Sequence, residues 1–145
     1  MLNGRLNYYL KRADANCTCQ FNEYFDETIV NNRGRECSYF NFSGGERKRI
    51  DLAMLFTFMD IRRMQSNIFV NIALYDELLD TSLDSKGIEC ILDILKDRVT
   101  SNNEAIYIIS HKNEAAKHAT GEIIYLEKEN DITKRKPYEQ FISAS

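Results

Sequence analysis

The chain has 145 residues and a formal net charge of −3, from 19 lysine and arginine residues against 22 aspartate and glutamate residues. This length fits one domain with a sizeable core, since 43% of the residues are hydrophobic, and the 28% that are charged argue against a disordered tail. The mild acidity excludes a histone-type polycation but leaves open a local nucleic-acid surface built with a partner.

The N-terminal part of the chain predicts a helix followed by a hairpin. The apolar residues of the helix follow one heptad seam: Leu2, Leu6, Tyr9 and Ala13. An ordinary amphipathic helix over residues 1–16 fits this spacing equally well. A strand rich in aromatic residues is expected from Phe21 to Val30, then a turn at 31–34 and a returning strand from Cys37 to Phe42.

A long helix is predicted after Ser43. Ser43 is a typical N-cap residue, and Glu46 three positions later completes a capping box. Apolar residues then lie on nearly every face, so the helix is expected to be deeply buried. These residues are Ile50, Leu52, Ala53, Met54, Leu55, Phe56, Phe58 and Met59.

Strands and helices alternate over residues 72–133. Two short apolar runs, at residues 72–75 and 105–109, predict buried strands of a parallel sheet. The other expected elements are a helix from Ser85 that stops at Asn102-Asn103, a short helix to about Ala119, and a terminal hairpin over residues 123–133. This alternation predicts an α/β fold whose sheet is parallel at its centre and flanked by helices.

The cysteines and the apolar runs indicate the compartment. The pair Cys17 and Cys19 resembles half of a metal site, but no histidine or second cysteine pair lies at zinc spacing, which favours reduced thiols. No apolar run approaches the ~18 residues of a membrane helix, and no apolar signal core follows residues 1–5. We therefore expect a cytoplasmic protein without a membrane partner.

The sequence Ser43-Gly44-Gly45 at a helix start is a candidate phosphate site. Two glycines leave the backbone N–H groups unobstructed at the positive end of the helix dipole, where phosphate binds. A plain helix cap with a glycine turn is the structural alternative. The cations of Arg47-Lys48-Arg49 contact phosphate or DNA on one interpretation, and form a solvated helical turn on the other.

The ends of the two apolar strands carry a second group of candidate residues. Asp76 can hold Mg²⁺ beside a triphosphate, and Glu77 can deprotonate an attacking water. His111, at the end of the next strand, can hydrogen-bond a γ-phosphate. An acidic pair on a loop and a structural histidine are the alternatives, and His118 is assigned a structural role.

In this order and spacing the motifs resemble the C-terminal half of an ABC-type P-loop ATPase head. Ser43-Gly44-Gly45-Glu46 resembles the signature motif, Leu74-Tyr75-Asp76-Glu77 the Walker B segment, Ser82-Leu83-Asp84 the D-loop, and His111 the switch histidine. The glutamate and arginine that follow the glycines are similar to those of SMC-like repair ATPases. Within these, the chain resembles the large subunits of SbcC-type nuclease complexes, including the ATPases of T-even phage recombination endonucleases, over about residues 1–135.

Two features depart from the pattern of this family. No Gly-x-x-x-x-Gly-Lys-Ser/Thr motif occurs, so the P-loop that binds phosphate is missing. Five residues, Leu78 to Ser82, separate Asp76-Glu77 from Leu83-Asp84, where the family usually has four. Because of the extra residue, the spacing does not assign the D-loop roles uniquely among Asp80, Ser82 and Asp84.

In this family the P-loop lies in an N-terminal lobe, and an antiparallel coiled coil joins the two lobes. The resemblance therefore implies that residues 1–19 form the base of the coiled-coil arm and residues 20–145 the C-terminal lobe.

The resemblance implies half of an ATP-driven machine for DNA double-strand-break repair and recombination. Two heads would enclose ATP and Mg²⁺, with Ser43, Gly44, Gly45 and Glu46 binding the nucleotide of the opposite head, Asp76 holding the metal, Glu77 acting as general base and His111 sensing the γ-phosphate. The implied partners are an N-terminal P-loop lobe, a second head, a nuclease subunit and DNA, and this chain alone is expected to be inactive. The alternatives are an SMC-type chromosome-structuring head or another ABC ATPase, such as a transporter subunit, and a non-hydrolytic dimerisation module.

Overall fold

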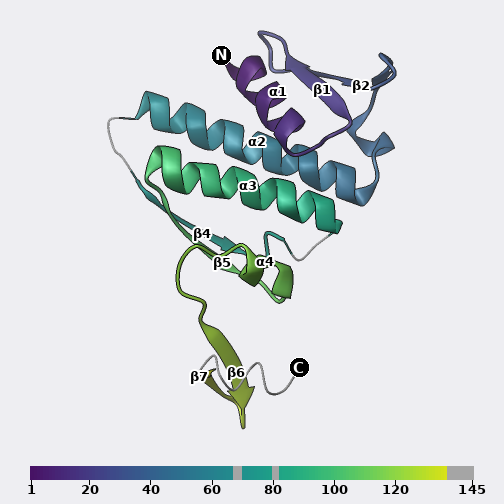
Figure 1. Cartoon of the computed structure of the whole chain (residues 1–145). Coiled ribbons are helices and arrows are strands. Elements are labelled where there is room, and N and C mark those ends of the chain that lie inside the picture. Colours follow the sequence, from purple (N-terminus) through teal and green to yellow (C-terminus); the bar gives the residue numbers. More distant parts are fainter. Residues whose placement is uncertain (67–69, 80–81, 137–145) are drawn as a thin grey trace. The chain divides into compact units, whose positions relative to one another are not determined.

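The computed structural model describes residues 1–66, 70–79 and 82–136, which fall into two compact units, residues 1–115 and residues 116 onward. In chain order the elements are α1 (Leu2–Arg12), β1 (Cys17–Phe21), β2 (Glu27–Asn31), β3 (Glu36–Cys37), the 3₁₀ turn η1 (Tyr39–Asn41), α2 (Gly44–Gln65), β4 (Ile72–Asp76), α3 (Ser85–Asn102), β5 (Ala105–Ile109), α4 (Asn113–Lys117), β6 (Tyr125–Glu129) and β7 (Ile132–Lys136) (Figure 1). The strands pair as an antiparallel β1–β2–β3 sheet, a parallel β4–β5 pair and an antiparallel β6–β7 hairpin.

Strands β4 and β5 form the predicted parallel pair, in register from Ile72 opposite Ala105 to Asp76 opposite Ile109. Helices α2 and α3 lie side by side over one face of this pair (Figure 1). The other face is open, and four of its large apolar side chains are more than half exposed: Ile72, Leu74, Tyr107 and Ile109. The predicted burial of these strands therefore holds only for the face that α2 and α3 cover. The strands have the composition of a sheet covered on both sides, but this unit supplies helices for one side only.

The N-terminal hairpin turns earlier than predicted. A single strand was expected from Phe21 to Val30, but β1 ends at Phe21 and β2 begins at Glu27. Asn22 forms the turn, because its Oδ1 accepts hydrogen bonds from the backbone N–H groups of Tyr24 and Asp26, each at 2.9 Å. The returning strand is also shorter than expected: β3 is Glu36–Cys37, and η1 follows it.

Helix α1 packs against α2 and β1. Three residues of the apparent heptad seam, Leu6, Tyr9 and Ala13, are buried within this unit, so intramolecular packing accounts for their spacing. Because α1 ends at Arg12 and β1 begins at Cys17, the boundary expected after residue 19 falls inside a strand.

Two asparagines of α1 pair with the outer edge of β1. Asn7 donates to the carbonyl of Cys19 at 2.7 Å and accepts from its N–H at 3.0 Å. Asn3, one turn earlier, makes the same pair of bonds to Phe21, both at 2.9 Å. Side-chain amides therefore satisfy backbone groups that would otherwise leave an unpaired strand edge.

Helix α2 begins at the predicted capping box. The Ser43 hydroxyl oxygen accepts from the N–H of Glu46 at 3.4 Å, and the Glu46 carboxylate accepts from the N–H of Ser43 at 2.9 Å. The expectation of a helix buried all round is wrong, because Leu55 and Phe58 are 40% and 47% exposed. Helix α3 ends as predicted, with Asn103 in the left-handed conformation that caps many helices.

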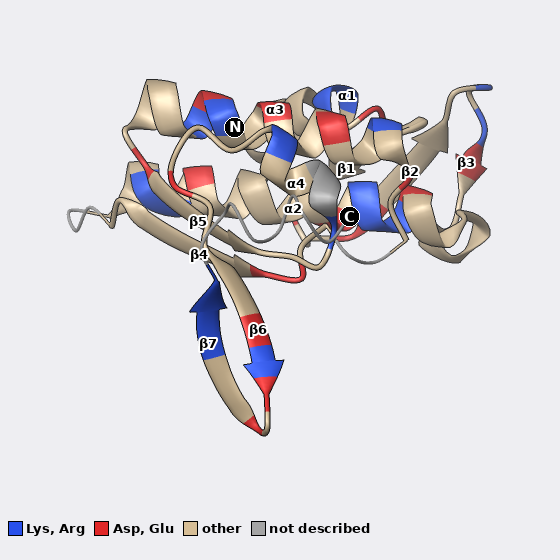
Figure 2. Ribbon diagram, turned by 60° about the horizontal axis from the view of Figure 1, so that its bottom comes forward, with Lys and Arg blue, Asp and Glu red and all other residues tan. Residues whose placement is uncertain are grey.

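The second unit contains the predicted terminal hairpin. Its turn residues Asn130 and Asp131 both have positive φ, at 49° and 63°, as a tight turn between antiparallel strands requires. Strand β7 is rich in cations (Figure 2). Its Lys134 and Lys136 pair with Glu129 and Glu127 of β6. None of the helices in the described part of the chain is long and apolar enough to cross a membrane.

Candidate functional site

The carboxyl ends of β4 and β5 bring three predicted residues to one edge of the sheet. Asp76 is the last residue of β4, and the N–H of Glu77 donates to the carbonyl of Ile109 at 3.0 Å. This bond places Glu77 beside the end of β5, where His111 Nε2 lies 3.8 Å from Glu77 Oε1. Both side chains are more than half exposed and can reach a ligand.

Glu77 has an unusual backbone conformation. Its φ is +52°, in the left-handed region that a residue with a Cβ rarely adopts. Such a conformation costs roughly 1–3 kcal/mol and persists only where the surrounding structure holds it. The hydrogen bond from the N–H of Glu77 to the carbonyl of Ile109 holds this conformation immediately after the end of β4.

The start of α2 presents the serine–glycine sequence to solvent. Ser43 and Gly44 are exposed, and the first N–H groups of a helix have no partners within it. The Ser43 hydroxyl donates to Glu46 Oε2 at 2.8 Å. Hydrogen bonds from the backbone and side chain of Ser43 hold the pKa of Glu46 below its ordinary value. The carboxylate is therefore ionised at neutral pH and orients the serine.

The segment that resembles a D-loop packs against this helix start. A Cβ built on Gly45 would lie only 2.7 Å from the carbonyl oxygen of Ser82, whose φ is +55°. Asp84 is the N-cap of α3 and accepts from the N–H of Gly87 at 2.9 Å. Lys112, after β5, donates to the carbonyl of Leu83 at 3.5 Å. The segment thus contacts two other parts of the candidate site, while Asp80 lies outside the described residues.

The close approach of Ser82 gives Gly45 a packing role that the motif alone does not reveal. We expect Gly45→Ala to destabilise the fold by about 1–3 kcal/mol, because the carbonyl of Ser82 belongs to the backbone and must shift. Gly4→Ala is the matched control: it adds a methyl group to a helix where nothing lies within 4 Å. There we expect a gain of up to ~1 kcal/mol from helix propensity. Urea denaturation followed by circular dichroism measures both, and equal midpoints for the two variants would contradict the contact.

The three cations that follow Glu46 have different environments. Arg47 stacks on the ring of Tyr39, 5.9 Å from its centre, and Lys48 is half-buried. Arg49 is only 8% exposed, so neither of the expected roles, a DNA contact or a solvated turn, fits it.

Asp76 is the candidate ligand for a metal ion in this chain. Among the residues that the structure describes, no three His, Cys, Asp or Glu side chains cluster as a metal cage would. Asp76 supplies one exposed carboxylate, which fits Mg²⁺, since this ion keeps several waters and combines one or two carboxylates with substrate phosphates. Cys17 and Cys19 face the core instead, and burial raises the pKa of the Cys17 thiol to about 11.

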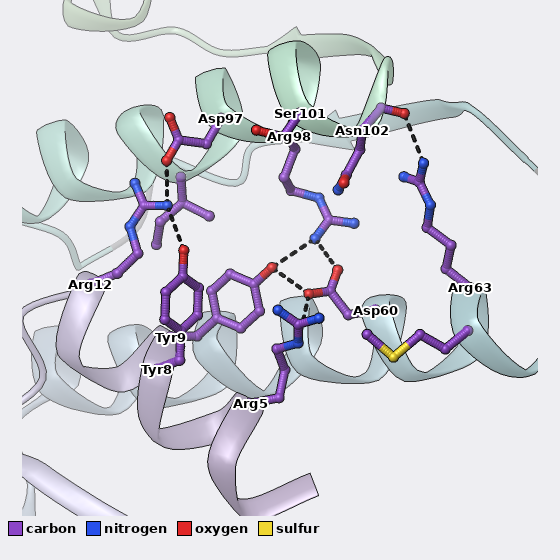
Figure 3. Close-up of a pocket in the computed structure, with 12 residues that line it drawn as sticks. Arg5, Tyr8, Tyr9, Arg12, Asp60, Arg63, Asp97, Arg98, Ser101 and Asn102 are labelled. Carbon is purple, nitrogen blue, oxygen red and sulfur yellow. Dashed lines mark hydrogen bonds and ion pairs between the residues drawn. The ribbon is translucent and has the colours of Figure 1, made fainter. Parts of the chain in front are cut away.

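A network of buried charges, which the motifs did not indicate, lies where α1, α2 and α3 meet (Figure 3). The Arg98 guanidinium lies 2.6 Å from Oδ1 of Asp60 and donates twice to Glu104, at 2.9 Å each. Tyr9 donates to Asp60 at 2.7 Å. A pocket of about 460 Å³ adjoins this network, and the arginines around it also have acidic partners: Arg5 pairs with Asp60, Arg12 with Asp97 and Arg63 with Glu104. The pocket walls are therefore ion pairs that join the three helices.

Comparisons with known proteins show what the sequence and the fold of the chain are similar to. No protein-family model matches the chain. The chain is 40% identical over 114 residues to exonuclease subunit 2 of Enterobacteria phage T4 and 38% identical over 113 residues to that of Escherichia phage RB69. Each match covers 78% of this chain, which spans about one fifth (20%) of the length of either relative. A chain from a structural study of ATP-driven dimerization and DNA-stimulated activation of SMC ATPases matches with a TM-score of 0.75 at 14% identity, over 99% of this chain and 88% of that one. The chain is therefore similar, over 78% of its length, to about one fifth of the phage exonuclease subunit 2 proteins, and it has the fold of an SMC ATPase head.

Proposed function

We propose that this chain is the C-terminal lobe of an ATPase head that binds and hydrolyses ATP between two dimerised heads, and that hydrolysis regulates a nuclease in DNA break repair and recombination. The observation that carries the proposal is the edge where β4 and β5 end. There Asp76, Glu77 and His111 are exposed together. The similarity to exonuclease subunit 2 supports a nuclease partner and a DNA substrate.

Each residue of the site has a role in this proposal. Glu77 is the general base: its carboxylate accepts a proton from the water that attacks the γ-phosphate. Asp76 holds Mg²⁺, which when bound offsets the negative charge of the phosphates. His111 donates a hydrogen bond to the γ-phosphate and loses that contact after hydrolysis. Ser43, with the N–H groups of Gly44 and Gly45, binds the γ-phosphate of the nucleotide held by the opposite head.

A second lobe is needed to complete the head. The exposed apolar face of β4 and β5 supports such a partner, because an apolar face of this kind is normally covered in a parallel sheet. The four side chains that a P-loop lobe would cover are Ile72, Leu74, Tyr107 and Ile109. On this proposal ATP binds once the P-loop lobe is supplied, either on the same chain or separately.

Replacing Ser43 tests the contact between heads. In the head completed by a P-loop lobe, we expect Ser43→Arg to abolish ATP-dependent dimerisation, because a long cation would occupy the space of the opposing γ-phosphate. Nucleotide binding by the P-loop lobe should remain nearly unchanged. Sedimentation with and without ATP measures the first effect, and a fluorescent ATP analogue measures the second.

Ser38→Arg is the matched control for this experiment. Ser38 is also an exposed N-cap serine, but it caps η1 and not the signature helix. We expect this variant to dimerise with ATP as the parent does. ATP-dependent dimerisation of the Ser43→Arg head at the parental level would remove Ser43 from the contact between heads.

The fold leaves a second candidate function, because the structural match is to SMC ATPases. A chromosome-structuring head would use the same ATP site with a different partner. Copurification from the native host with a nuclease subunit supports the repair function, and copurification with a non-nuclease bridging subunit supports the alternative.

A further inference from the structure

The buried guanidinium of Arg49 contacts two segments that are distant from it in sequence. Arg49 lies in the second turn of α2, and its Nη1 donates to the carbonyls of Ala13 at 2.9 Å and Asp14 at 3.1 Å, just after the end of α1. Its Nη2 lies 2.5 Å from Oδ1 of Asp84, the N-cap of α3. We call α2 the signature helix, because it begins at the Ser43-Gly44-Gly45 sequence, and residues 82–84 the D-loop segment. The Arg49 side chain therefore joins the end of α1, the signature helix and the D-loop segment.

A second link runs directly between the two outer segments. The ammonium of Lys86, in the first turn of α3, lies 2.6 Å from Oδ2 of Asp14. We call Asp14, Arg49, Asp84 and Lys86 the Arg49 junction. The contact between Arg49 and Asp84 leaves little space beside it, because a Cβ built on Gly87 would lie 2.8 Å from Asp84 Oδ1 and 3.1 Å from Arg49 Nη2. Arg49 is the buried member of the junction, whereas the side chains of Asp84 and Lys86 are 68% and 67% exposed.

We propose that Arg49 is a positioning residue: it holds the D-loop segment against the signature helix and ties both to the end of α1, so that the three segments move together when two heads engage. This inference rests on the proposed function. Two contacts at the start of α2 hold the D-loop segment, namely the approach of Ser82 to Gly45 and the ion pair between Arg49 and Asp84. A displacement of these segments at the nucleotide is transmitted to the end of α1 through the bonds from Arg49 to the carbonyls of Ala13 and Asp14.

The chemistry of the guanidinium explains why arginine occupies this position. Its planar fork offers donors in several fixed directions at once, which three oxygen acceptors on two segments require. A lysine keeps the charge beside Asp84 but has a single nitrogen, and that nitrogen cannot bond both segments with this geometry. Arg49→Lys therefore keeps the positive charge and removes the set of hydrogen-bond donors that joins the two segments.

The test measures ATP turnover by the completed head as a double-mutant cycle. The variants are Arg49→Lys, Asp84→Asn, which keeps a good N-cap residue, and the two combined. We expect either single change to lower kcat by about ten-fold or more, since small misplacements of reacting groups have effects of this size. KM for ATP should stay within about three-fold, because the P-loop lobe binds the nucleotide. The combined variant should lose little more than the worse single one.

Arg62→Gln is the matched control, because Arg62 is an exposed arginine on the same helix, and its kcat should equal that of the parent. Urea denaturation of the same samples shows whether turnover follows the folded fraction. Parental kcat in Arg49→Lys, additive losses in the cycle, or a loss that merely follows unfolding would each overturn the positioning role. If the parent head hydrolyses ATP and Arg49→Lys has the same kcat, only this inference is overturned. If the parent head does not hydrolyse ATP, the proposed function is overturned together with the inference.

Discussion

Glu77→Gln is expected to lower the ATP turnover of the completed head by about 100- to 10,000-fold, the usual contribution of a general base. Glutamine has nearly the size of glutamate and keeps much of its hydrogen bonding, but it does not accept a proton from water at neutral pH. Asp76 is unchanged, so ATP and Mg²⁺ should still bind. The engaged, ATP-bound dimer should therefore accumulate. Phosphate release measures the turnover, and sedimentation measures the dimer.

Two further variants make this result specific to Glu77. Glu89→Gln changes an exposed glutamate of α3 in the same way and should leave turnover unchanged. Asp76→Asn should act differently from Glu77→Gln, by raising the Mg²⁺ concentration needed for ATP binding. Turnover of the Glu77→Gln head within a few-fold of the parent would show that Glu77 is not the base and that the proposed mechanism is wrong.

Arg98→Met is expected to destabilise the chain by about 3–5 kcal/mol, the usual effect of removing one partner from a buried ion pair. The Arg98 side chain is 4% exposed, and the acids that it pairs with, Asp60 and Glu104, are 8% and 6% exposed. Methionine fills similar space without charge, so the loss reports two buried carboxylates that keep only Arg5 and Arg63 as cationic partners, and not an empty cavity. This loss is a large part of the ~5–15 kcal/mol that stabilises an ordinary domain.

The control for Arg98 lies in the same group of arginines (Figure 3). Arg12 pairs with Asp97, whose side chain is 60% exposed. We expect Arg12→Gln to destabilise the chain by no more than ~1 kcal/mol, as for other surface ion pairs. Urea denaturation of both variants, followed by circular dichroism, gives the comparison. Equal losses for Arg98→Met and Arg12→Gln would show that burial does not decide the energy of this network.

Several elements were predictable because their signals are local. The capping box of Ser43 and Glu46 lies within four consecutive residues, and the structure has the helix start that it predicts. Asn103 stops α3 through its own backbone conformation. The apolar runs that became β4 and β5 needed only their composition and length. The order of the motifs was also sufficient to indicate the ATPase fold, which the structural comparison confirms.

The sequence by itself thus determined where the main helices and the parallel strands lie and which residues are candidates for nucleotide chemistry. Only the tertiary structure decided which faces are buried, that Arg49 is a junction between segments and not a surface cation, and that Ser82 approaches Gly45. The physical reason is the range of the interactions. A cap or an apolar run depends on residues a few positions apart, whereas burial, ion pairing and close packing depend on segments that folding brings together from 35 or more positions away, as for Arg49 and Asp84.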